Sequence, residues 1–413
     1  PKALTVILLS MQPITVHKIG GSTLKTPQQL NNLLPSIGKN TGKKIIVVSA
    51  LFGITDSIIT ALESKEEHTE ILKNLYYTHL KWCLYIEDTR LRKRAIVKIR
   101  KAIAKLNADI NNYRTQPTPH LFAEIVSMGE RLSAIVIGGF IGKNQIVLLP
   151  EDLELTCTDN YANAKYTTLP GKCRDVIEST TEEWQVVPGF YGINSRGEKC
   201  LVGRGGTDYT AAEIAANANA KKLLFWKDSL GIQTGDPRLI TKATNIENIS
   251  VKTLQLMSIA GSGVLHNEVV SCVVRAGINV EFWSPSNINH ALSTIRNDCA
   301  TPQKPIIIVA KEDNKTDQWQ KITIISRNIT AALIIISQLR CNYPIIKTEL
   351  LESHAVAFHT STKSAIKVAT ILHQHFHENH FEKETCYTSK KNEGMQQHII
   401  QQKGSASRIL TIN

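Results

Sequence analysis

A glycine-rich loop that leads directly into a strong helix former is the segment that most constrains how this chain can fold. It reads Leu201-Val-Gly-Arg-Gly-Gly-Thr-Asp-Tyr-Thr-Ala-Ala212, and the helix-forming stretch Ala212-Glu-Ile-Ala-Ala-Asn-Ala218 follows. Bare backbone before a helix N-terminus presents N–H groups to an anion, with the positive end of the helix dipole behind them. We therefore expect an anion-binding loop at the start of a helix. A plain surface turn is the alternative for a glycine cluster taken alone.

Short apolar segments alternate with helical ones up to about residue 297, and this alternation predicts an α/β fold with a mostly parallel sheet. Leu, Ile and Ala recur every three to four positions over residues 56–116, and similar periodicity covers 122–141 and 251–259. The expected strands are Ile14–Ile19, Lys44–Ser49, Gln145–Leu149, Trp184–Pro188, Lys222–Trp226 and Asn279–Trp283.

The chain changes character after a polar stretch at 297–304 that contains Pro302 and that we interpret as a linker. A β-α-β-β-α order follows, which predicts a small ferredoxin-like α+β module. Its expected elements are a strand at 321–326, a helix at 329–340, strands at 345–351 and 355–358, and a helix at 363–377. Residues 408–412 could add a terminal strand.

Charge and composition indicate which classes of molecule the chain can bind. The net charge of the 413 residues is +12, and the basic residues are scattered, apart from Arg90-Leu-Arg-Lys-Arg94 in a helical stretch. This balance suits anionic substrates such as nucleotides, whereas nucleic-acid binding usually needs a basic patch or stripe. No apolar run reaches transmembrane length. We expect neither a nucleic-acid partner nor a membrane partner. Residues 1–10 are too short for a signal peptide, and Met11 is a more natural start.

Cysteine and histidine usage gives no sign of a metal site. The eight cysteines are spread widely without a C-x-x-C pair or metal-ligand spacing, which predicts reduced thiols in a cytoplasmic protein. His373, His375, His377 and His380 look like a metal cluster, but we expect no carboxylate or thiolate to join them at metal-ligand geometry. We interpret them as the solvated end of a helix, and we predict no bound metal ion held by the protein alone.

Five blocks in order resemble the motifs of aspartate kinases, which belong to the amino-acid kinase family. They are Val16–Thr23, Val47–Asp56, Ser127–Ala134, Gly203–Thr210 and Trp226–Arg238. The resemblance implies the amino-acid kinase fold, a three-layer α/β/α sandwich around a mainly parallel sheet, over residues 11–297. It also implies a shortened regulatory module of the ACT type over 303–413. The implied activity is transfer of the γ-phosphoryl group of Mg-ATP to L-aspartate, in lysine, threonine and methionine biosynthesis.

The same resemblance assigns roles to individual residues. Lys18 would neutralise charge on the transferring phosphoryl group, and Asp208 would orient Lys18 or a magnesium-bound water. On the substrate side, Arg204 would hold a carboxylate of aspartate and Glu130 its amino group, helped by the hydroxyls of Thr55 and Thr207. The nucleotide-binding positions would be Gly20, Gly21, Ser22, Lys227, Asp228, Gln233, Arg238, Gly263 and Val264. ATP and Mg²⁺ are the implied cofactors.

Departures from the family pattern concentrate on the nucleotide side. Lys227 stands where the family has Thr, Gln233 where it has Tyr, and Gly263 where it has a phosphate-contacting Lys. Loss of one such cation weakens nucleotide binding or transfer by roughly a few kcal/mol, and Lys227 could compensate. The alternatives are therefore a catalytically impaired aspartate-binding regulatory homologue and a kinase of the same fold for another amino acid.

The C-terminal region has room for one ACT-type module, whereas two are usual in the family. Its first strand-to-helix turn, Ser326-Arg-Asn-Ile329, lacks the glycine that lets an effector approach, so feedback by lysine or threonine is not expected. Modules of this type pair between subunits, and the resemblance therefore implies a homodimer.

Overall fold

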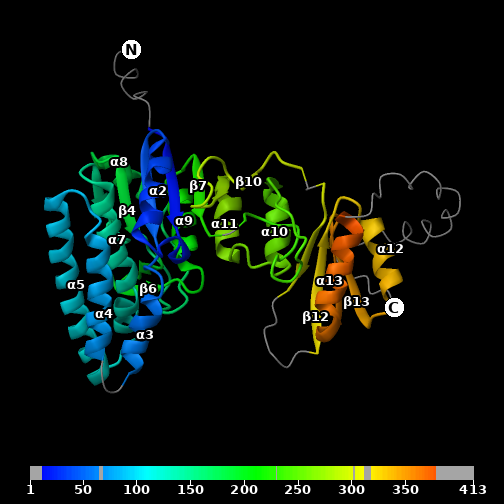
Figure 1. Cartoon of the computed structure of the whole chain (residues 1–413), viewed down its shortest axis with the longest axis horizontal. Coiled ribbons are helices and arrows are strands. Elements are labelled where there is room, and N and C mark those ends of the chain that lie inside the picture. Colours follow the sequence, from blue (N-terminus) through cyan, green and yellow to red (C-terminus); the bar gives the residue numbers. More distant parts are fainter. Residues whose placement is uncertain (1–11, 65–67, 229, 301–302, 311–317, 378–413) are drawn as a thin grey trace, which may run out of the picture. The chain divides into compact units, whose positions relative to one another are not determined.

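The computed structural model describes residues 12–64, 68–228, 230–300, 303–310 and 318–377. The chain divides into two compact units. The first contains the residues up to Leu230 together with Leu265–Arg296, and the second contains Gly231–Val264 and the residues from Asn297 onward. The elements are labelled as in Figure 1.

A twisted, mainly parallel sheet forms the centre of the first unit. Its hydrogen-bonded strand order is β3-β4-β2-β1-β7-β9-β10, and only the β9–β10 pair is antiparallel. β1 and β2 are buried along their whole length, as expected for parallel strands covered on both faces. The strands are β1 (Ile14–Ile19), β2 (Lys43–Val48), β3 (Gln145–Val147), β4 (Trp184–Pro188), β7 (Lys222–Trp226), β9 (Asn279–Trp283) and β10 (Ser293–Arg296).

Helices cover both faces of this sheet, which gives three layers. On one face, α7 packs against β2, β3 and β4, and α2 to α5 share its apolar core. On the other face, α9 packs against β1, β2 and β7, with α8 and α11 beside it. The helices are α2 (Pro27–Gly38), α3 (Ile54–Glu63), α4 (His68–Cys83), α5 (Thr89–Thr115), α6 (Pro119–Val126), α7 (Met128–Ile141), α8 (Lys172–Ser179), α9 (Gly206–Asn217) and α11 (Asn267–Ala276). A short 3₁₀ helix, η1 (Gly21–Thr23), and the hairpin β5 (Tyr191–Ile193) and β6 (Lys199–Leu201) complete the unit.

The second unit contains an antiparallel sheet with strand order β11-β12-β14-β13. Helices α12 and α13 share an apolar core with it, to which Ile240 also contributes. The elements are β8 (Asn248–Ser250), α10 (Val251–Ile259), β11 (Ile306–Val309), β12 (Trp319–Ile325), α12 (Ile329–Leu339), β13 (Ile345–Glu352), β14 (Ala355–Ser361) and α13 (Thr362–His377). The expected β-α-β-β-α order is confirmed as β12-α12-β13-β14-α13, and β11 is an additional edge strand.

The predicted fold class, an α/β sandwich followed by a smaller α+β module, is confirmed. The helical periodicity over 56–116 belongs to three separate helices, α3, α4 and α5. Periodicity alone does not predict these breaks, because it does not show where a capping residue ends one helix and starts the next. The carboxylate of Asp88, for example, accepts hydrogen bonds from the backbone N–H groups of Arg90 and Leu91 and so starts α5. The run over 122–141 is likewise two helices, α6 and α7, which meet at Ser127.

One interpretation of the histidine-rich helix end is wrong. His373 on α13 is 1% exposed rather than solvated, and its Nε2 lies 2.8 Å from the Thr234 hydroxyl. His377 stacks on His373, and its Nε2 lies 3.0 Å from the carbonyl oxygen of Pro305. Both rings therefore help to pack the second unit. His380 and the possible strand at 408–412 lie outside the described residues.

Candidate active site

A cavity of about 460 Å³ opens at the carboxyl ends of the central strands of the first unit. Ligands of open α/β sheets bind at this edge, because the loops that follow neighbouring parallel strands meet there. Six of the residues proposed from the sequence line this one cavity. Its lining residues are Lys18, Ser49, Thr55, Glu130, Phe190, Gly203, Arg204, Gly205, Gly206, Thr207 and Asp208.

Two lysines flank one carboxylate in this cavity. The Nζ of Lys18, near the end of β1, lies 2.7 Å from Oδ1 of Asp208 in the first turn of α9. The Nζ of Lys227, the residue after β7, lies 2.9 Å from Oδ2 of the same carboxylate. The side chains of Lys18 and Asp208 are only 10% and 13% exposed. The carboxylate of Asp208 therefore lies between two lysine ammonium groups.

The ionisation of this triad follows from its burial and its charges. Burial raises the pKa of the Asp208 carboxyl, but Lys18 and Lys227 lower it more, so the pKa lies well below its ordinary value. Burial lowers the pKa of Lys18 below its ordinary value, Asp208 opposes that shift, and Lys227 adds to it. An ionised Asp208 is thus the group that keeps two neighbouring ammonium groups in place.

Glu130 also lines the cavity, and one of its carboxylate oxygens has no hydrogen-bond partner among the described residues. It is 4% exposed in the first turn of α7, and its Oε1 accepts a hydrogen bond from the backbone N–H of Ala50 at 3.2 Å. Its Oε2 is buried without a hydrogen-bond partner among the described residues. Burial raises the pKa of Glu130 to about 8, against the smaller opposing effects of Ala50 and Lys18. A cation that enters the cavity would satisfy Oε2 and favour the ionised form.

The glycine-rich loop presents Arg204 at the mouth of the cavity. Gly203 and Gly205 have φ angles of +77° and +72°, which only glycine adopts without cost, and Gly205 is the N-cap of α9. Arg204 between them is exposed and forms no ion pair within the described part of the chain. The loop thus places a guanidinium group beside a helix N-terminus, and both attract a carboxylate or a phosphate. The anion-binding loop predicted from the sequence therefore has the expected geometry.

An adjoining cavity of about 290 Å³ extends toward the start of η1 and is lined in part by Gly21, Ser22, Thr55 and Glu130. Gly20, just before it, leaves room for the catalytic lysine proposed above, because a Cβ at Gly20 would lie 2.9 Å from the Nζ of Lys18. The three residues assigned to nucleotide binding in this segment, Gly20, Gly21 and Ser22, thus lie next to the cavity that contains Lys18.

The remaining nucleotide-side positions are less concentrated. Asp228 is half exposed and pairs with Lys25 at 3.2 Å. Arg238, in the second unit, has a 76% exposed side chain and pairs with Asp236. Gln233 bridges to Asn245 within that unit, and Gly263 has a φ of +67°. The backbone N–H of Val264 lies 3.4 Å from the hydroxyl of Ser262. Nucleotide binding by Gln233, Arg238, Gly263 and Val264 stays a prediction.

Sequence reasoning missed several lining groups. Ser49 and Ala50 directly follow β2. The apolar run of β2 identifies it as a buried parallel strand, and residues that follow such a strand lie at the edge of the sheet where ligands bind. Phe190 also lines the cavity, with an unusual φ of +76°, and its backbone N–H donates to the Thr210 hydroxyl at 2.9 Å. No sequence pattern announces such a conformation in a phenylalanine. No sequence pattern predicts the direct contact of Lys227 with Asp208 either.

A larger hollow of about 720 Å³ lies at the other end of the strands and contains none of the residues proposed from the sequence. Its lining includes Pro13 before β1, Gly42 before β2 and Asn144 before β3. The amino ends of parallel strands seldom carry the site in this fold class. We therefore assign the candidate active site to the cavity between Lys18 and Glu130.

Comparison with known proteins agrees with this geometry. Residues 13–283 match the sequence profile of the Amino acid kinase family. The chain is 24% identical over 282 residues to lysine-sensitive aspartokinase 3 of Escherichia coli (strain K12), covering 65% of this chain and 61% of that protein. It is 27% identical over 285 residues to the aspartokinase of Chlamydia pneumoniae, covering 64% of this chain and 59% of that protein. The chain thus aligns with about three fifths of the length of these relatives.

Solved structures show the same fold. The crystal structure of Escherichia coli aspartokinase III with aspartate and ADP has a TM-score of 0.72 at 18% identity, covering 87% of this chain and 99% of that one. Clostridium acetobutylicum aspartate kinase has a TM-score of 0.68 at 17% identity, covering 88% and 100%. No helix among the described residues is long and apolar enough to cross a membrane. The family match covers well over half of the sequence, and the chain therefore belongs to the amino acid kinase family.

Proposed function

We propose that this protein is an aspartate kinase. It transfers the γ-phosphoryl group of Mg-ATP to the side-chain carboxylate of L-aspartate and yields 4-phospho-L-aspartate, the first intermediate of lysine, threonine and methionine biosynthesis. Members of the amino acid kinase family use ATP, and a relative of the same fold was crystallised with aspartate and ADP. These relatives support the proposal, while the choice of aspartate rests on the residues of the cavity.

The observation that carries the proposal is the pairing of one open anion site with one open cation site in a single cavity. Arg204 has a guanidinium group without an ion-pair partner in the described part of the chain, and Glu130 has a buried oxygen without a hydrogen-bond partner there. An α-amino acid carries a carboxylate and an ammonium group, so it satisfies both. The hydroxyls of Thr55 and Thr207 line the same space and can bind the second carboxylate.

The proposed phosphoryl transfer does not require a general base in the cavity. The attacking side-chain carboxylate of aspartate is already ionised at neutral pH, so the protein needs to align it and to neutralise charge on the phosphoryl group. Lys18 supplies a fixed positive charge, and Asp208 holds that ammonium group in place and also contacts Lys227. Mg²⁺ bound with ATP would neutralise phosphate charge, and Asp208 would orient a magnesium-bound water.

Lys227 supports ATP use despite the departures from the family pattern. Gly263 stands at the position where the family has a phosphate-contacting lysine. Lys227 nevertheless adds a second ammonium group, 2.9 Å from Asp208, which lines the cavity. Charge near the phosphates is thus supplied from the end of β7. We propose that Gly20, Gly21, Ser22, Lys227 and Asp228 of the first unit bind the nucleotide. The nucleotide-binding roles of Gln233, Arg238, Gly263 and Val264 stay predictions from the sequence.

A coupled assay of ADP release with L-aspartate and Mg-ATP tests the proposal, together with trapping of the product by hydroxylamine. An acyl phosphate reacts with hydroxylamine to give a hydroxamate, so both signals should appear and both should require aspartate. L-glutamate and D-aspartate serve as matched substrates and should give much lower rates. Absence of aspartate-dependent turnover at millimolar substrate would contradict the proposal.

The altered nucleotide side favours one alternative, a catalytically impaired homologue that binds aspartate for regulation. Calorimetry separates the two possibilities, since both proteins bind aspartate but only the kinase also binds Mg-ATP with micromolar-to-millimolar affinity. Aspartate binding without ATP binding would support the alternative.

We also propose that residues 11–297 form the catalytic domain and that residues 303–413 form an ACT-like regulatory domain that pairs with a second copy. Residues Gly231–Val264 belong to the proposed catalytic domain, although they pack in the second compact unit. The boundaries of the proposed domains therefore differ from those of the two compact units. β13 is an edge strand with half-exposed Ile346 and Leu350, which suits pairing between subunits. Light scattering behind size-exclusion chromatography would measure twice the chain mass for the dimer.

A further inference from the structure

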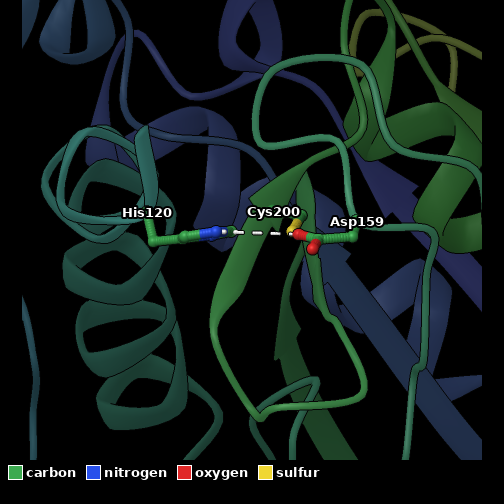
Figure 2. A group of neighbouring side chains, drawn as sticks. All are labelled: His120, Asp159 and Cys200. Atoms are coloured by element: carbon green, nitrogen blue, oxygen red, sulfur yellow. Dashed lines mark ion pairs between the residues drawn. The ribbon is translucent and has the colours of Figure 1, made fainter. Parts of the chain in front are cut away.

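A second group of functional atoms converges next to the β5–β6 hairpin, outside the cavity described above. Figure 2 shows His120 of α6 pointing toward Asp159, with Cys200 of β6 beside them. The imidazole nitrogen, a carboxylate oxygen and the thiol sulfur all lie within 4.8 Å of one another. Cys200 is fully buried, His120 is partly buried and Asp159 is exposed, so the group lies at the protein surface with its thiol on the inner side.

The donor atoms are held in the orientation that a metal ion requires. The Nδ1 of His120 lies 3.3 Å from the carbonyl oxygen of Lys199, and a carbonyl only accepts, so Nδ1 carries the hydrogen. The other ring nitrogen, Nε2, lies 3.6 Å from Oδ1 of Asp159. Asn194 donates a hydrogen bond to the same Oδ1 at 2.9 Å. Backbone carbonyls and amides commonly fix metal-ligating histidines and carboxylates in this way.

The spacing of the donors also suits a small divalent ion. Donor atoms around a tetrahedral zinc ion lie roughly 3.3–3.9 Å apart, given the usual zinc–ligand bond lengths. The 3.6 Å between Nε2 of His120 and Oδ1 of Asp159 falls in that range. The sulfur of Cys200 lies within 4.8 Å of both atoms, so a small shift of its side chain would bring it to ligand distance as the third donor. Nitrogen, oxygen and thiolate sulfur together are typical ligands of Zn²⁺ and not of Mg²⁺ or Ca²⁺.

The guanidinium group of Arg196 lies against two of these donor residues. Its Nη2 lies 2.8 Å from Oδ2 of Asp159 and 3.4 Å from Nε2 of His120, and its Nε lies 2.7 Å from Glu198. Glu198 also lies 3.2 Å from Nε2 of His120, so two carboxylates face this nitrogen. The Arg196 side chain is 58% exposed and can move into solvent when another cation binds.

We propose that His120, Asp159 and Cys200 form a Zn²⁺ site whose fourth position is taken by water or by the Glu198 carboxylate. Binding breaks the S–H bond of Cys200, releases that proton to solvent and forms a zinc–sulfur bond, with no change of oxidation state. Cys200 lies three residues before Gly203, and α6 leads into α7, which carries Glu130. The ion would thus tie together the two segments that carry Arg204 and Glu130.

Metal titration of the full chain tests this site. After treatment with a chelator and its removal, Zn²⁺ titrated in competition with a chromophoric chelator should bind at one ion per chain. Co²⁺ in its place should give a near-ultraviolet thiolate charge-transfer band. Cys200→Ser should abolish that band and weaken zinc binding about 10-fold or more, the scale on which metal-site changes act. Cys341→Ser, which removes an exposed thiol, should leave both signals unchanged.

Arg196→Gln separates the proposal from a simple ion-pair network. If Arg196 competes with the metal ion, its removal should tighten zinc binding several-fold while the cobalt band persists. If the group is only an ion-pair network, neither the wild-type chain nor the Arg196→Gln variant binds zinc stoichiometrically, and the proposal is overturned. Loss of the band in Cys341→Ser would overturn it as well. These readouts do not depend on catalysis, so they remain informative whether or not the chain phosphorylates aspartate.

Discussion

The Nζ of Lys18 lies 2.7 Å from Oδ1 of Asp208, although the two residues come from the first strand of the sheet and from a helix that begins at the glycine-rich loop. β1 pairs with β7 in parallel, and this pairing also brings Lys227 to the opposite oxygen of the same carboxylate. One anion thus fixes two cations at the edge of the sheet where phosphate charge can be neutralised. The first two predictions test this arrangement.

Replacing Lys18 by Ala should reduce kcat about 10²–10³-fold, since one preorganised charge contact to the transferring group is lost. The KM for aspartate should change little, because Arg204 and Glu130 bind that substrate in the proposal. Steady-state kinetics with both substrates varied measures the two effects. Turnover near the wild-type rate would show that Lys227 or another cation holds the phosphates and that the assignment of Lys18 is wrong.

Replacing Gly20 by Ala tests the position of that ammonium group without removing it. The new Cβ would lie 2.9 Å from the Nζ of Lys18 and would displace it, so kcat should fall roughly 10-fold or more, as for other small misplacements of catalytic groups. Gly38→Ala is the matched control, because its Cβ would make only ordinary contact with Trp184 at 3.6 Å. Equal activity of the two variants would contradict the proposed role of Lys18.

Replacing Arg204 by Ala should act on substrate binding first. Loss of a hydrogen-bonded charge contact costs about 1.5–3 kcal/mol, so the KM for aspartate should rise roughly 10–100-fold with a smaller change in kcat. Arg204→Lys keeps the charge but not the two-pronged geometry, and it should recover only part of the affinity. Calorimetric titration with aspartate checks both variants. Full recovery with lysine would indicate that charge alone matters.

Aspartate affinity should rise between pH 6 and pH 8 because of Glu130. Its pKa of about 8 means that the carboxyl is mostly protonated at neutral pH in the empty site. The ammonium group of aspartate favours the ionised form, so binding must release a proton below pH 8, and affinity should increase by up to about 10-fold per pH unit.

The measurement for this prediction is calorimetry at pH 6, 7 and 8 in buffers of different ionisation enthalpy, which reports the number of protons released. Glu130→Gln has no proton to release, so its weaker binding should depend little on pH over the same interval. A wild-type affinity that is flat over this interval would contradict the assignment of Glu130 as the partner of the amino group.

The sequence by itself determined the fold class, most strand positions and six of the residues that line the main cavity. Segments such as Ile45–Val48 and Leu223–Trp226 are continuous apolar runs, since a parallel sheet covered on both faces leaves no polar alternation. Glycines at positions that need a positive φ, such as Gly203 and Gly205, are equally local signals. These features can be predicted from the sequence because the burial or backbone conformation of each position restricts which residue types can occupy it.

Only the tertiary structure decided which distant side chains meet. Lys227 contacts Asp208 because β7 lies beside β1, and no local pattern encodes that distance. His120, Asp159 and Cys200 show no metal-ligand spacing, yet a helix end, a loop and a hairpin bring them within 4.8 Å. Burial of His373 likewise depends on Thr234, far away in the chain. Strand order and packing set such contacts, and both arise from the chain as a whole rather than from neighbouring residues.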